Sequence, residues 1–312
     1  MALRIFTEPQ QGASYDQLLA VARTAEKCGF SAFFRSDHFL KMGSGSGLRS
    51  TTDAWITMAG LARDTSTIRL GTLVSPVTFR PVGTFIVTAT QVDRMSDGRV
   101  EIGLGAGWYK AEHDAFGLSF PEPGARYDLL EDQLAILHGA WSAAPNSTYE
   151  FSGKTCRVRI DAETVRTVQK PHPPIIMGGS GGPRSARMAA AIADEYNVSF
   201  VPKETTREVH DRVRKACESI DRDPAALAWS AAQVVCCGRT ESEIARRAEA
   251  IGSDAVDVRK NGLGGTPAEI LENLEGFASL GVDRFYLQVL DLTDLDHLRL
   301  LADEVLPHAP GR

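Results

Sequence analysis

Apolar residues along this chain follow two alternating patterns. Short apolar runs rich in β-branched and aromatic side chains, such as residues 3–8 and 283–290, are typical of buried strands. Between such runs, apolar residues recur at every third or fourth position, as at Tyr15, Leu18 and Ala22, which is typical of amphipathic helices. The alternation continues through most of the chain and predicts a series of strand–helix units.

The pattern predicts eight strands, most of them followed by a helix. The strands are expected at residues 3–8, 30–36 after a helix cap at Gly29, 68–76, 98–107, 173–182, 195–201, 227–238 and 283–290. Helices are expected at 15–25, 54–65, 82–95, 126–141, 183–193, 205–219, 241–251, 267–280 and 295–305. Eight alternating units favour a parallel sheet closed into a (β/α)8 TIM barrel. An open, doubly wound sheet is the alternative, but no G-x-G-x-x-G follows the first strand.

The alternation is interrupted near residues 145–172. Apolar and polar residues there alternate with a period of two on both sides of Gly153, which indicates an inserted hairpin. The chain contains no linker, low-complexity segment or fixed-period repeat. We therefore expect a single barrel domain over residues 1–312 with an insertion at this point.

Composition limits the range of functions. Apolar residues make up 43% of the chain, enough for a large core, and the net charge of −6 argues against binding to nucleic acid. No apolar run reaches the ~18 residues of a membrane helix, and no signal-peptide pattern occurs at the start. Five cysteines without a C-x-x-C pair are typical of a reducing compartment. We expect a cytoplasmic protein that binds neither membrane nor nucleic acid.

The second predicted strand ends in Arg35, Asp37 and His38, and the active sites of such barrels lie at the C-terminal ends of the strands. A histidine beside a carboxylate suits proton transfer near neutral pH. Adjacent residues of a strand point to opposite faces, so Asp37 and His38 both face the barrel axis only if the strand has ended. The alternative is that His38 is a solvated loop residue. Arg35 is expected to be structural.

Glycines mark the end of the fourth strand, at Gly103, Gly105 and Gly107. A row of glycines lets a flat ligand approach the backbone, although it equally permits close helix packing. Trp108 and Tyr109 follow and add aromatic surface, and titratable Glu112 and His113 come soon after.

A second glycine-rich turn, "GGSGG" at residues 178–182, runs directly into the helix that begins near Pro183. Free backbone N–H groups and the positive end of a helix form a site for anions, to which Arg184 would add charge. The turn lacks the Lys-Ser/Thr of a Walker A motif. A phosphate-binding turn is the favoured interpretation, and a flexible turn without a ligand is the alternative.

Other chemistries have less support. The seven histidines show no H-x-x-x-H or H-E-x-x-H spacing, so no metal site is expected. The nucleophile motif G-x-S-x-G is absent. A cofactor-free aldolase or isomerase would need a lysine or paired carboxylates at the strand ends, and Lys41 lies beyond the second strand.

Together these segments resemble the bacterial-luciferase-like family of flavin and deazaflavin enzymes, and most closely its branch that uses coenzyme F420. The resemblance covers essentially the whole chain. It rests on "GFSAFFRSDHF", "IRLGTLVSPVTFRPVGTFIVTATQVDRMSDGRVEIGLGAGW" and "PPIIMGGSGGPRSARMAAAIADEYN", in this order. It implies a (β/α)8 barrel, commonly a homodimer, with the cofactor ring at the C-terminal ends of the strands.

The resemblance also implies roles for individual residues. A strand-three bulge with a non-proline cis peptide would support the ring, and the phosphate would lie on the "GGSGG" turn. The implied cofactor-binding residues are Leu73, Val74, Ser75, Gly105, Trp108, Gly178, Gly179, Ser180, Gly181 and Gly182. The implied catalytic residues are His38 and Asp37. Some relatives carry a glutamate where this chain has Trp108, so Glu112, one helical turn further on, is the substitute candidate.

These roles imply an F420-dependent oxidoreductase that transfers hydride between the deazaflavin and a small organic substrate. An FMN-dependent luciferase-like monooxygenase is the alternative, and a catalytically silent cofactor-binding protein is a further one. The substrate itself is not indicated. The segments expected to shape its pocket are residues 41–55, 145–172 and 260–265.

Overall fold

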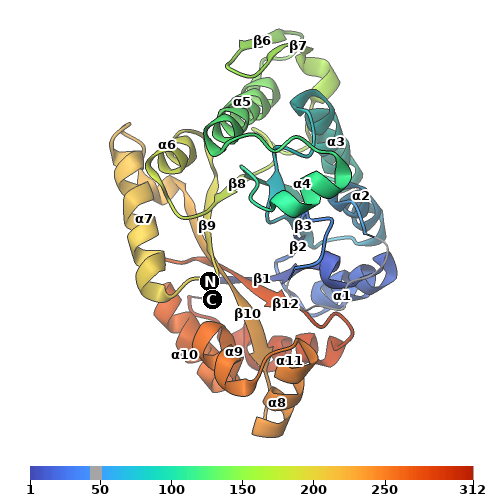
Figure 1. Cartoon of the computed structure of the whole chain (residues 1–312), viewed down its shortest axis with the longest axis vertical. Helices are drawn as coiled ribbons and strands as arrows, with labels where there is room; N and C mark the ends of the chain where they lie inside the picture. Colours follow the sequence, from blue (N-terminus) through green and yellow to red (C-terminus); the bar gives the residue numbers. More distant parts are fainter. Residues whose placement is uncertain (43–50, 312) are drawn as a thin grey trace.

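In the computed structural model, which describes residues 1–42 and 51–311, eight parallel strands close into a barrel (Figure 1). In pairing order they are β1 (Ala2–Thr7), β2 (Ala32–Arg35), β3 (Arg69–Thr72), β5 (Val100–Gly105), β8 (Ile175–Gly178), β9 (Glu195–Ser199), β10 (Ala228–Cys237) and β12 (Arg284–Val289). β12 pairs with β1, which closes the barrel. The predicted TIM barrel is confirmed, and the open sheet is excluded.

Helices surround the barrel (Figure 1). The α-helices are α1 (Tyr15–Lys27), α2 (Ala54–Asp64), α3 (Val82–Met95), α4 (Lys110–Phe116), α5 (Pro123–Ser142), α6 (Pro183–Ile192), α7 (Lys203–Glu218), α8 (Glu241–Ala250), α9 (Ala255–Asn261), α10 (Pro267–Ala278) and α11 (Leu295–Glu304). Short 3-10 turns are η1 (Pro9–Gln11), η2 (Ala162–Val165), η3 (Pro224–Ala226) and η4 (Leu306–His308). None of the helices in the described ranges is long and apolar enough to cross a bilayer.

Helix α1 begins with a capping box, in which the Ser14 side chain accepts from the backbone of Gln17 and the Gln17 side chain accepts from Ser14. Helix α2 begins at Asp53, whose carboxylate accepts from the N–H groups of Trp55 and Ile56. Helices α4 and α9 and strand β11 were not predicted. The predicted loop at residues 260–265 contains β11 (Leu263–Gly265), which extends the sheet beside β10, because buried Leu263 packs into the core there.

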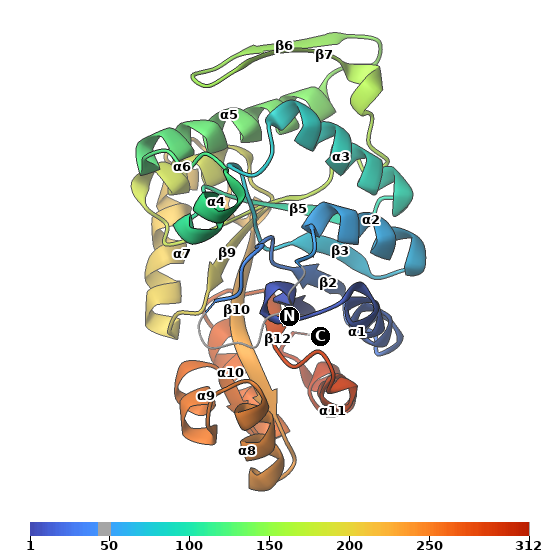
Figure 2. The ribbon, with the colours of Figure 1, turned by 45° about the vertical axis from the view of Figure 1, so that its right-hand side comes forward.

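The insertion is a hairpin of β6 (Thr148–Ser152) and β7 (Arg157–Asp161), as the alternation predicted. Figure 2 shows it lying over α5, apart from the barrel. Tyr149 attaches it to that helix by donating a hydrogen bond to the carbonyl oxygen of Ala135 (3.1 Å). Asp132 of α5 also accepts from the backbone N–H of Thr155, at the hairpin tip (2.6 Å).

Strand three is interrupted at the mouth of the barrel. β3 ends at Thr72, the Leu73–Val74 peptide is cis, and the chain resumes as β4 (Ser75–Pro76), which pairs with β5. The prediction of a continuous strand over residues 68–76 is therefore wrong, whereas the predicted cis peptide is confirmed. Gly103 leaves the room that this turn needs, because a Cβ there would lie 1.9 Å from the carbonyl oxygen of Thr72.

We expect Gly103→Ala to destabilise the protein by about 2–3 kcal/mol, because the added methyl meets backbone that cannot move aside. Gly83→Ala, in the first turn of α3 where a Cβ meets nothing within 4 Å, is the control. It should be neutral or stabilise by less than about 1 kcal/mol. Urea unfolding midpoints measure both. Equal effects of the two substitutions would contradict the close approach at Thr72.

Residues of β1 alternate between two environments. Leu3 and Ile5 point outward into the main hydrophobic core, which lies between the strands and the helices. Phe6 belongs to a smaller cluster inside the barrel, and Arg4 shares this inward parity. Along β1, the side chains inside the barrel are thus charged near the start of the strand, at Arg4, and apolar nearer the cavity, at Phe6.

A layer of buried charges crosses the barrel interior around Arg4. Its guanidinium lies 2.6 Å from Glu101 and 3.0 Å from the hydroxyl of Tyr286. That hydroxyl donates to one oxygen of Glu195 (2.7 Å), and Arg284 pairs with the other (2.6 Å). The side chains of Glu101 and Glu195 are at most 1% exposed. Each buried carboxylate is thus paired with a cation, as its desolvation requires.

Candidate active site

A cavity of about 560 Å³ opens at the C-terminal ends of the strands. Its walls come from segments that follow β1, β2, β3, β5, β8 and β9. The lining residues are Phe6, Glu8, Ser36, His38, Met42, Leu73, Val74, Pro76, Gly105, Ala106, Gly107, Trp108, Glu112, Tyr127, Gly178, Gly179, Asn197, Ser199 and Phe200. Of the predicted site residues, it brings together His38, Glu112, Leu73, Val74, Gly105, Trp108, Gly178 and Gly179.

His38 and Glu112 form a hydrogen-bonded pair in the cavity wall. His38 Nδ1 lies 2.9 Å from one carboxylate oxygen of Glu112, and the other oxygen accepts from the N–H of Phe39 (3.0 Å). The Glu112 side chain is 1% exposed and that of His38 is 14% exposed. A carboxylate that accepts a hydrogen bond from Nδ1–H fixes the orientation of the ring. The other nitrogen, Nε2, is then left to exchange a proton with a ligand.

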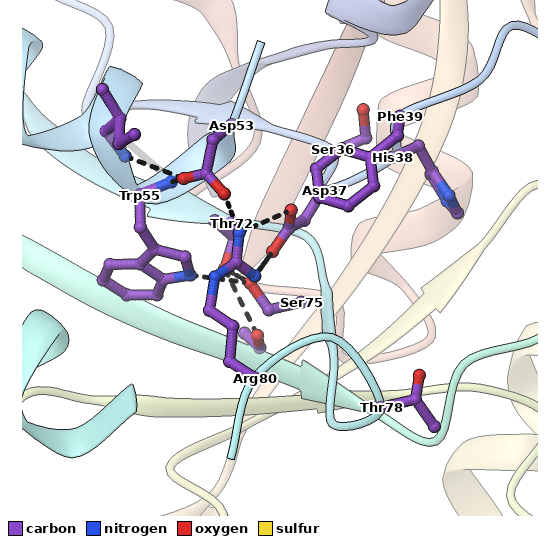
Figure 3. A network of polar contacts seen from close by, with 12 residues as sticks. Ser36, Asp37, His38, Phe39, Asp53, Trp55, Thr72, Ser75, Thr78 and Arg80 are labelled. Carbon is purple, nitrogen blue, oxygen red and sulfur yellow. Dashed lines mark hydrogen bonds and ion pairs between the residues drawn. The ribbon is translucent and has the colours of Figure 1, made fainter. Parts of the chain in front are cut away.

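Asp37 does not belong to this pair. Strand β2 ends at Arg35, yet Asp37 turns away from the cavity while His38 turns toward it (Figure 3). The Asp37 carboxylate is fully buried, 2.6 Å from the guanidinium of Arg80, and accepts from the Ser75 hydroxyl (2.6 Å). The predicted Asp37–His38 active-site pair is therefore corrected: the partner of His38 is Glu112, because Arg80 holds Asp37 elsewhere.

Arg80 is the centre of a polar network behind the cavity wall (Figure 3). It pairs with Asp37 and also with Asp53, the cap of α2. Burial opposes ionisation of Asp53, but the charge of Arg80 brings its pKa below the ordinary value. Trp55 donates to the Ser75 hydroxyl (3.0 Å). The predicted cofactor-binding Ser75 therefore points into this network, and it lies outside the cavity lining.

Arg35 is structural, as expected. Its guanidinium is fully buried and donates to the carbonyl of Ser36, to the hydroxyls of Thr52 and Thr57 and to further backbone oxygens. Burial lowers the pKa of Arg35 to about 10, against the opposing effect of the nearby carboxylates. The residue joins the end of β2 to the start of α2.

One wall of the cavity consists largely of backbone. Leu73 and Val74 line it at the cis peptide, and Gly105 of β5 lies so close that a Cβ there would be 2.8 Å from Val74 Cγ2. Gly178 and Gly179 continue the wall, and a Cβ on Gly179 would project into open space. A flat surface without side chains suits the face of a planar ring system, so these residues fit a flavin-type cofactor.

The "GGSGG" turn leads from the cavity edge to the N-terminus of α6. Gly178 and Gly179 line the cavity, whereas Ser180, Gly181 and Gly182 lie beyond it. The Gly181 N–H is occupied, since it donates to the hydroxyl of Tyr196 (3.0 Å). The Gly179 N–H is occupied too, since it donates to the carbonyl oxygen of Asn197 (3.2 Å). The amides of Ser180 and Gly182 and the start of α6 offer the helix-end geometry that binds anions.

Charge reaches this turn from a residue that the sequence interpretation missed. Arg184 pairs instead with Asp128 and Glu131 of α5, so its predicted role at the turn is wrong. Arg212 of α7 donates to the carbonyl oxygens of Ser180 (2.8 Å) and Gly181 (3.2 Å). Its place was not apparent from the sequence, because it lies on the next helix along the chain.

Aromatic side chains form the rim of the cavity. Trp108 is 64% exposed, stacks on Tyr109 with ring centroids 5.2 Å apart, and meets His38 edge-on at 5.7 Å. Phe200, from the end of β9, is 45% exposed and adopts a left-handed φ of +58°. Phe6 lies beside it inside the barrel, with ring centroids 6.4 Å apart.

Helix α4, which carries Glu112 and follows Trp108, is held by His113. The fully buried His113 ring donates from Nδ1 to the carbonyl oxygen of Tyr109 (2.8 Å), and its Nε2 accepts from the Thr78 hydroxyl (2.7 Å). The helix therefore has a fixed attachment to the segment after β4. This attachment keeps Glu112 in reach of His38.

Several lining residues were not predicted. Glu8 follows β1 directly, and the strand-end rule that selected His38 applies to it equally. Asn197 and Ser199 share the inward parity of β9, and the Asn197 amide donates to the Ser230 hydroxyl (2.9 Å). Met42 and Phe200 carried no comparable signal. No group of three or more potential ligands for a metal ion converges anywhere in the described ranges.

Comparison with known proteins places this geometry in a family. Residues 1–276 match the model of the luciferase-like monooxygenases. Protein y4vJ of Sinorhizobium fredii (strain NBRC 101917 / NGR234) is 30% identical over 175 residues, which cover 56% of this chain and 46% of that protein. The chain thus matches about half the length of this curated relative.

Two solved structures have the same fold. An F420-dependent secondary alcohol dehydrogenase in complex with an F420–acetone adduct superposes with a TM-score of 0.81 and 18% identity, covering 98% of both chains. Riboflavin lyase RcaE, with modified FMN and riboflavin, gives a TM-score of 0.80 and 15% identity, covering 98% of this chain and 90% of the other. With the fold, the cavity at the strand ends and the family match over residues 1–276, this chain belongs to the luciferase-like monooxygenase family of oxidoreductases.

Proposed function

We propose that the protein is a coenzyme F420-dependent oxidoreductase that transfers hydride between the deazaflavin and a small organic substrate. The carrying observation is the His38–Glu112 pair in the cavity wall, with Nδ1 and the carboxylate 2.9 Å apart. Reduction of a carbonyl group needs a proton for its oxygen as well as a hydride for its carbon. His38 is suited to give that proton, and Glu112 is suited to orient the ring.

The remaining roles follow from the cavity wall. The backbone at Val74, Gly105 and Gly179 would hold the cofactor ring, and the turn before α6 would hold its phosphate. A bound deazaflavin supplies or accepts the hydride. Trp108 and Phe200 would cover the reacting atoms and exclude water.

Protons and electrons balance in either direction. In reduction, the Nε2 proton of His38 would go to the carbonyl oxygen as the C=O π bond breaks, and the bound cofactor would supply the hydride, with its two electrons, for the carbonyl carbon. In oxidation, His38 Nε2 takes the hydroxyl proton as the hydride leaves carbon. Glu112 keeps its hydrogen bond to Nδ1 throughout, which stabilises the charged imidazole.

An FMN-dependent monooxygenase is the second candidate. The same backbone wall fits either ring system, and one structural neighbour carries modified FMN. The proton-transfer pair favours the deazaflavin, because hydride transfer to a carbonyl needs a proton donor beside the substrate and no oxygen site. Titration of the protein with F420 and with FMN, followed by tryptophan fluorescence, separates the two. Tight FMN binding without F420 binding would overturn the proposal.

Substitution at the backbone wall tests the cofactor site. We expect Gly179→Ala to weaken cofactor binding about tenfold or more, because its Cβ would enter the space beside the wall. Gly179 has a φ of +132°, so alanine also strains the backbone there. Gly29→Ala is the control, since Gly29 has a φ of +81° and lies outside the cavity lining. Unchanged cofactor affinity in Gly179→Ala would contradict the assigned ring position.

We also propose, from the family resemblance, that the protein assembles as a homodimer. The chain has a mass of 33.8 kDa, so sedimentation equilibrium distinguishes a monomer from a particle of twice that mass. A monomer at micromolar concentration would contradict the proposed assembly and would leave the cofactor proposal untouched.

A further inference from the structure

Two carboxylates, those of Glu8 and Glu112, line the cavity. Glu8 lies at the rim, where its carboxylate accepts a hydrogen bond from Gln11 (3.3 Å), and Glu112 is paired with His38. In residues 1–42 and 51–311, no lysine or arginine lines the cavity. A substrate that carried phosphate or carboxylate would therefore meet Glu8 without an opposing cation from these residues.

Arginines on the surrounding elements are held away from the cavity. Arg80 is bound to Asp37 and Asp53 behind the wall, with its side chain only 16% exposed. Arg184 is bound to Asp128 and Glu131. Either arginine would have to break two ion pairs to reach a substrate. One of the two partners of Arg80, Asp37, is fully buried.

Arg212 is engaged at the other end of the site. It donates to the carbonyl oxygens of Ser180 and Gly181, in the turn assigned to the cofactor phosphate. Two of its donor groups are therefore occupied by the backbone of that turn. No arginine of this set remains for an anionic group on the substrate.

Part of the cavity lining is apolar. Trp108 and Phe200 expose 64% and 45% of their area, and Met42 lines the cavity with them. Phe200 reaches this position through its left-handed backbone. Exposed aromatic area of this kind is unfavourable in water, and a bound apolar group would cover it.

From these charges and this apolar surface we infer that the substrate is an uncharged, largely apolar aldehyde, ketone or alcohol. The inference rests on the proposed function for the hydride step and adds the class of compound that undergoes it. The polar oxygen would face His38, and the apolar body would contact Trp108, Phe200 and Met42. We expect compounds that carry phosphate or carboxylate to bind more weakly, because no lysine or arginine of residues 1–42 and 51–311 lines the cavity to offset the charge of Glu8.

Matched pairs that differ only in charge test the inference. Benzaldehyde is compared with 4-formylbenzoate, and hexanal with 6-oxohexanoate, on the full chain with reduced F420. Initial rates come from cofactor absorbance, and binding of each compound comes from equilibrium dialysis with oxidised F420 present. We expect the neutral member of each pair to bind at least tenfold more tightly, and to have the higher kcat/KM wherever turnover occurs.

Two variants locate the cause of the discrimination. Glu8→Gln should reduce the neutral-over-anion ratio about threefold or more, because it removes the repelling charge. Phe200→Lys should bind the anionic member more tightly than the wild type does. In dialysis, this variant should therefore prefer the anionic member to the neutral one. Glu150→Gln, on the exposed hairpin, is the matched control that should leave the ratio unchanged.

The outcomes separate the two proposals. Equal or tighter binding of the anionic members, or no binding of the neutral members, would overturn the inference about substrate charge. Neutral members that bind, but never exchange hydride with F420, would instead overturn the proposed function. Because dialysis does not depend on turnover, the charge inference is decided in either case.

Discussion

Replacement of His38 by asparagine is expected to lower kcat about 10²- to 10³-fold, the usual contribution of a general acid–base group. Asparagine retains a polar group near Glu112 but has no proton to exchange at the position of Nε2. The cofactor affinity should change little, because the backbone wall and the turn before α6 are untouched. Steady-state rates with a neutral aldehyde measure kcat, and fluorescence titration measures the affinity for F420.

Glu112→Gln should lower kcat about 10- to 100-fold, since the amide can offer its own N–H to Nδ1 and so favour the wrong tautomer of His38. The double variant distinguishes a catalytic unit from two independent residues. If Glu112 acts only through His38, then His38→Asn/Glu112→Gln will be no slower than His38→Asn alone. If the kcat losses of the two single variants multiply in the double variant, Glu112 does not act only through His38. Unchanged turnover in His38→Asn would contradict the role of His38 in proton transfer.

Loss of one charge from the barrel interior should have the largest effect on stability. We expect Glu101→Gln to lower the free energy of unfolding by about 3–5 kcal/mol, because it removes the carboxylate nearest to the buried Arg4. Arg69, which also pairs with Glu101, loses its partner as well. Urea denaturation measures the change, with circular dichroism as the probe.

An exposed ion pair provides the control. Glu150 and Arg159 face each other across the hairpin, with side chains 63% and 77% exposed. Glu150→Gln should change stability by less than about 1 kcal/mol. A loss in Glu101→Gln as small as the loss in this control would show that the interior charges contribute little.

The same glutamate predicts a dependence on pH. Burial opposes ionisation of Glu101, but Arg4 and Arg69 bring its pKa below the ordinary value of 4.5. A carboxyl group whose pKa is lower in the folded state stabilises the protein above its unfolded pKa. That contribution is lost as the pH falls through the folded pKa. Wild-type stability should therefore fall more steeply below pH 4.5 than that of Glu101→Gln.

Much of the barrel was predictable, because its signals are local. The eight strands are apolar runs, and the helices between them carry caps such as Ser14 and Asp53 close in sequence. The ionic interior also had a local signal that was not used. Arg4 and Glu101 interrupt apolar strands at the positions that alternate with Leu3 and Ile102.

The interruption of strand three and the direction of Asp37 depend on contacts between distant segments. The turn at Leu73–Val74 needs the space over Gly103, about thirty residues further along the chain. Asp37 points away from the cavity because Arg80 and Ser75 bind its carboxylate from the next unit. An adjacent Asp–His pair carries no information about such partners, so the sequence alone did not show that Glu112, rather than Asp37, lies beside His38.

Two parts of the cavity lining differ in how readily evolution can change their amino acids. The part formed by Val74, Gly105 and Gly179 contains two glycines and a cis peptide, and a Cβ on Gly105 would lie 2.8 Å from Val74 Cγ2, so substitutions there disturb the wall itself. Met42, Trp108 and Phe200 contribute side chains to the lining, and these can be replaced. Selection can therefore exchange one substrate for another at three positions while retaining the cofactor, and a combinatorial library at those positions is the direct laboratory counterpart.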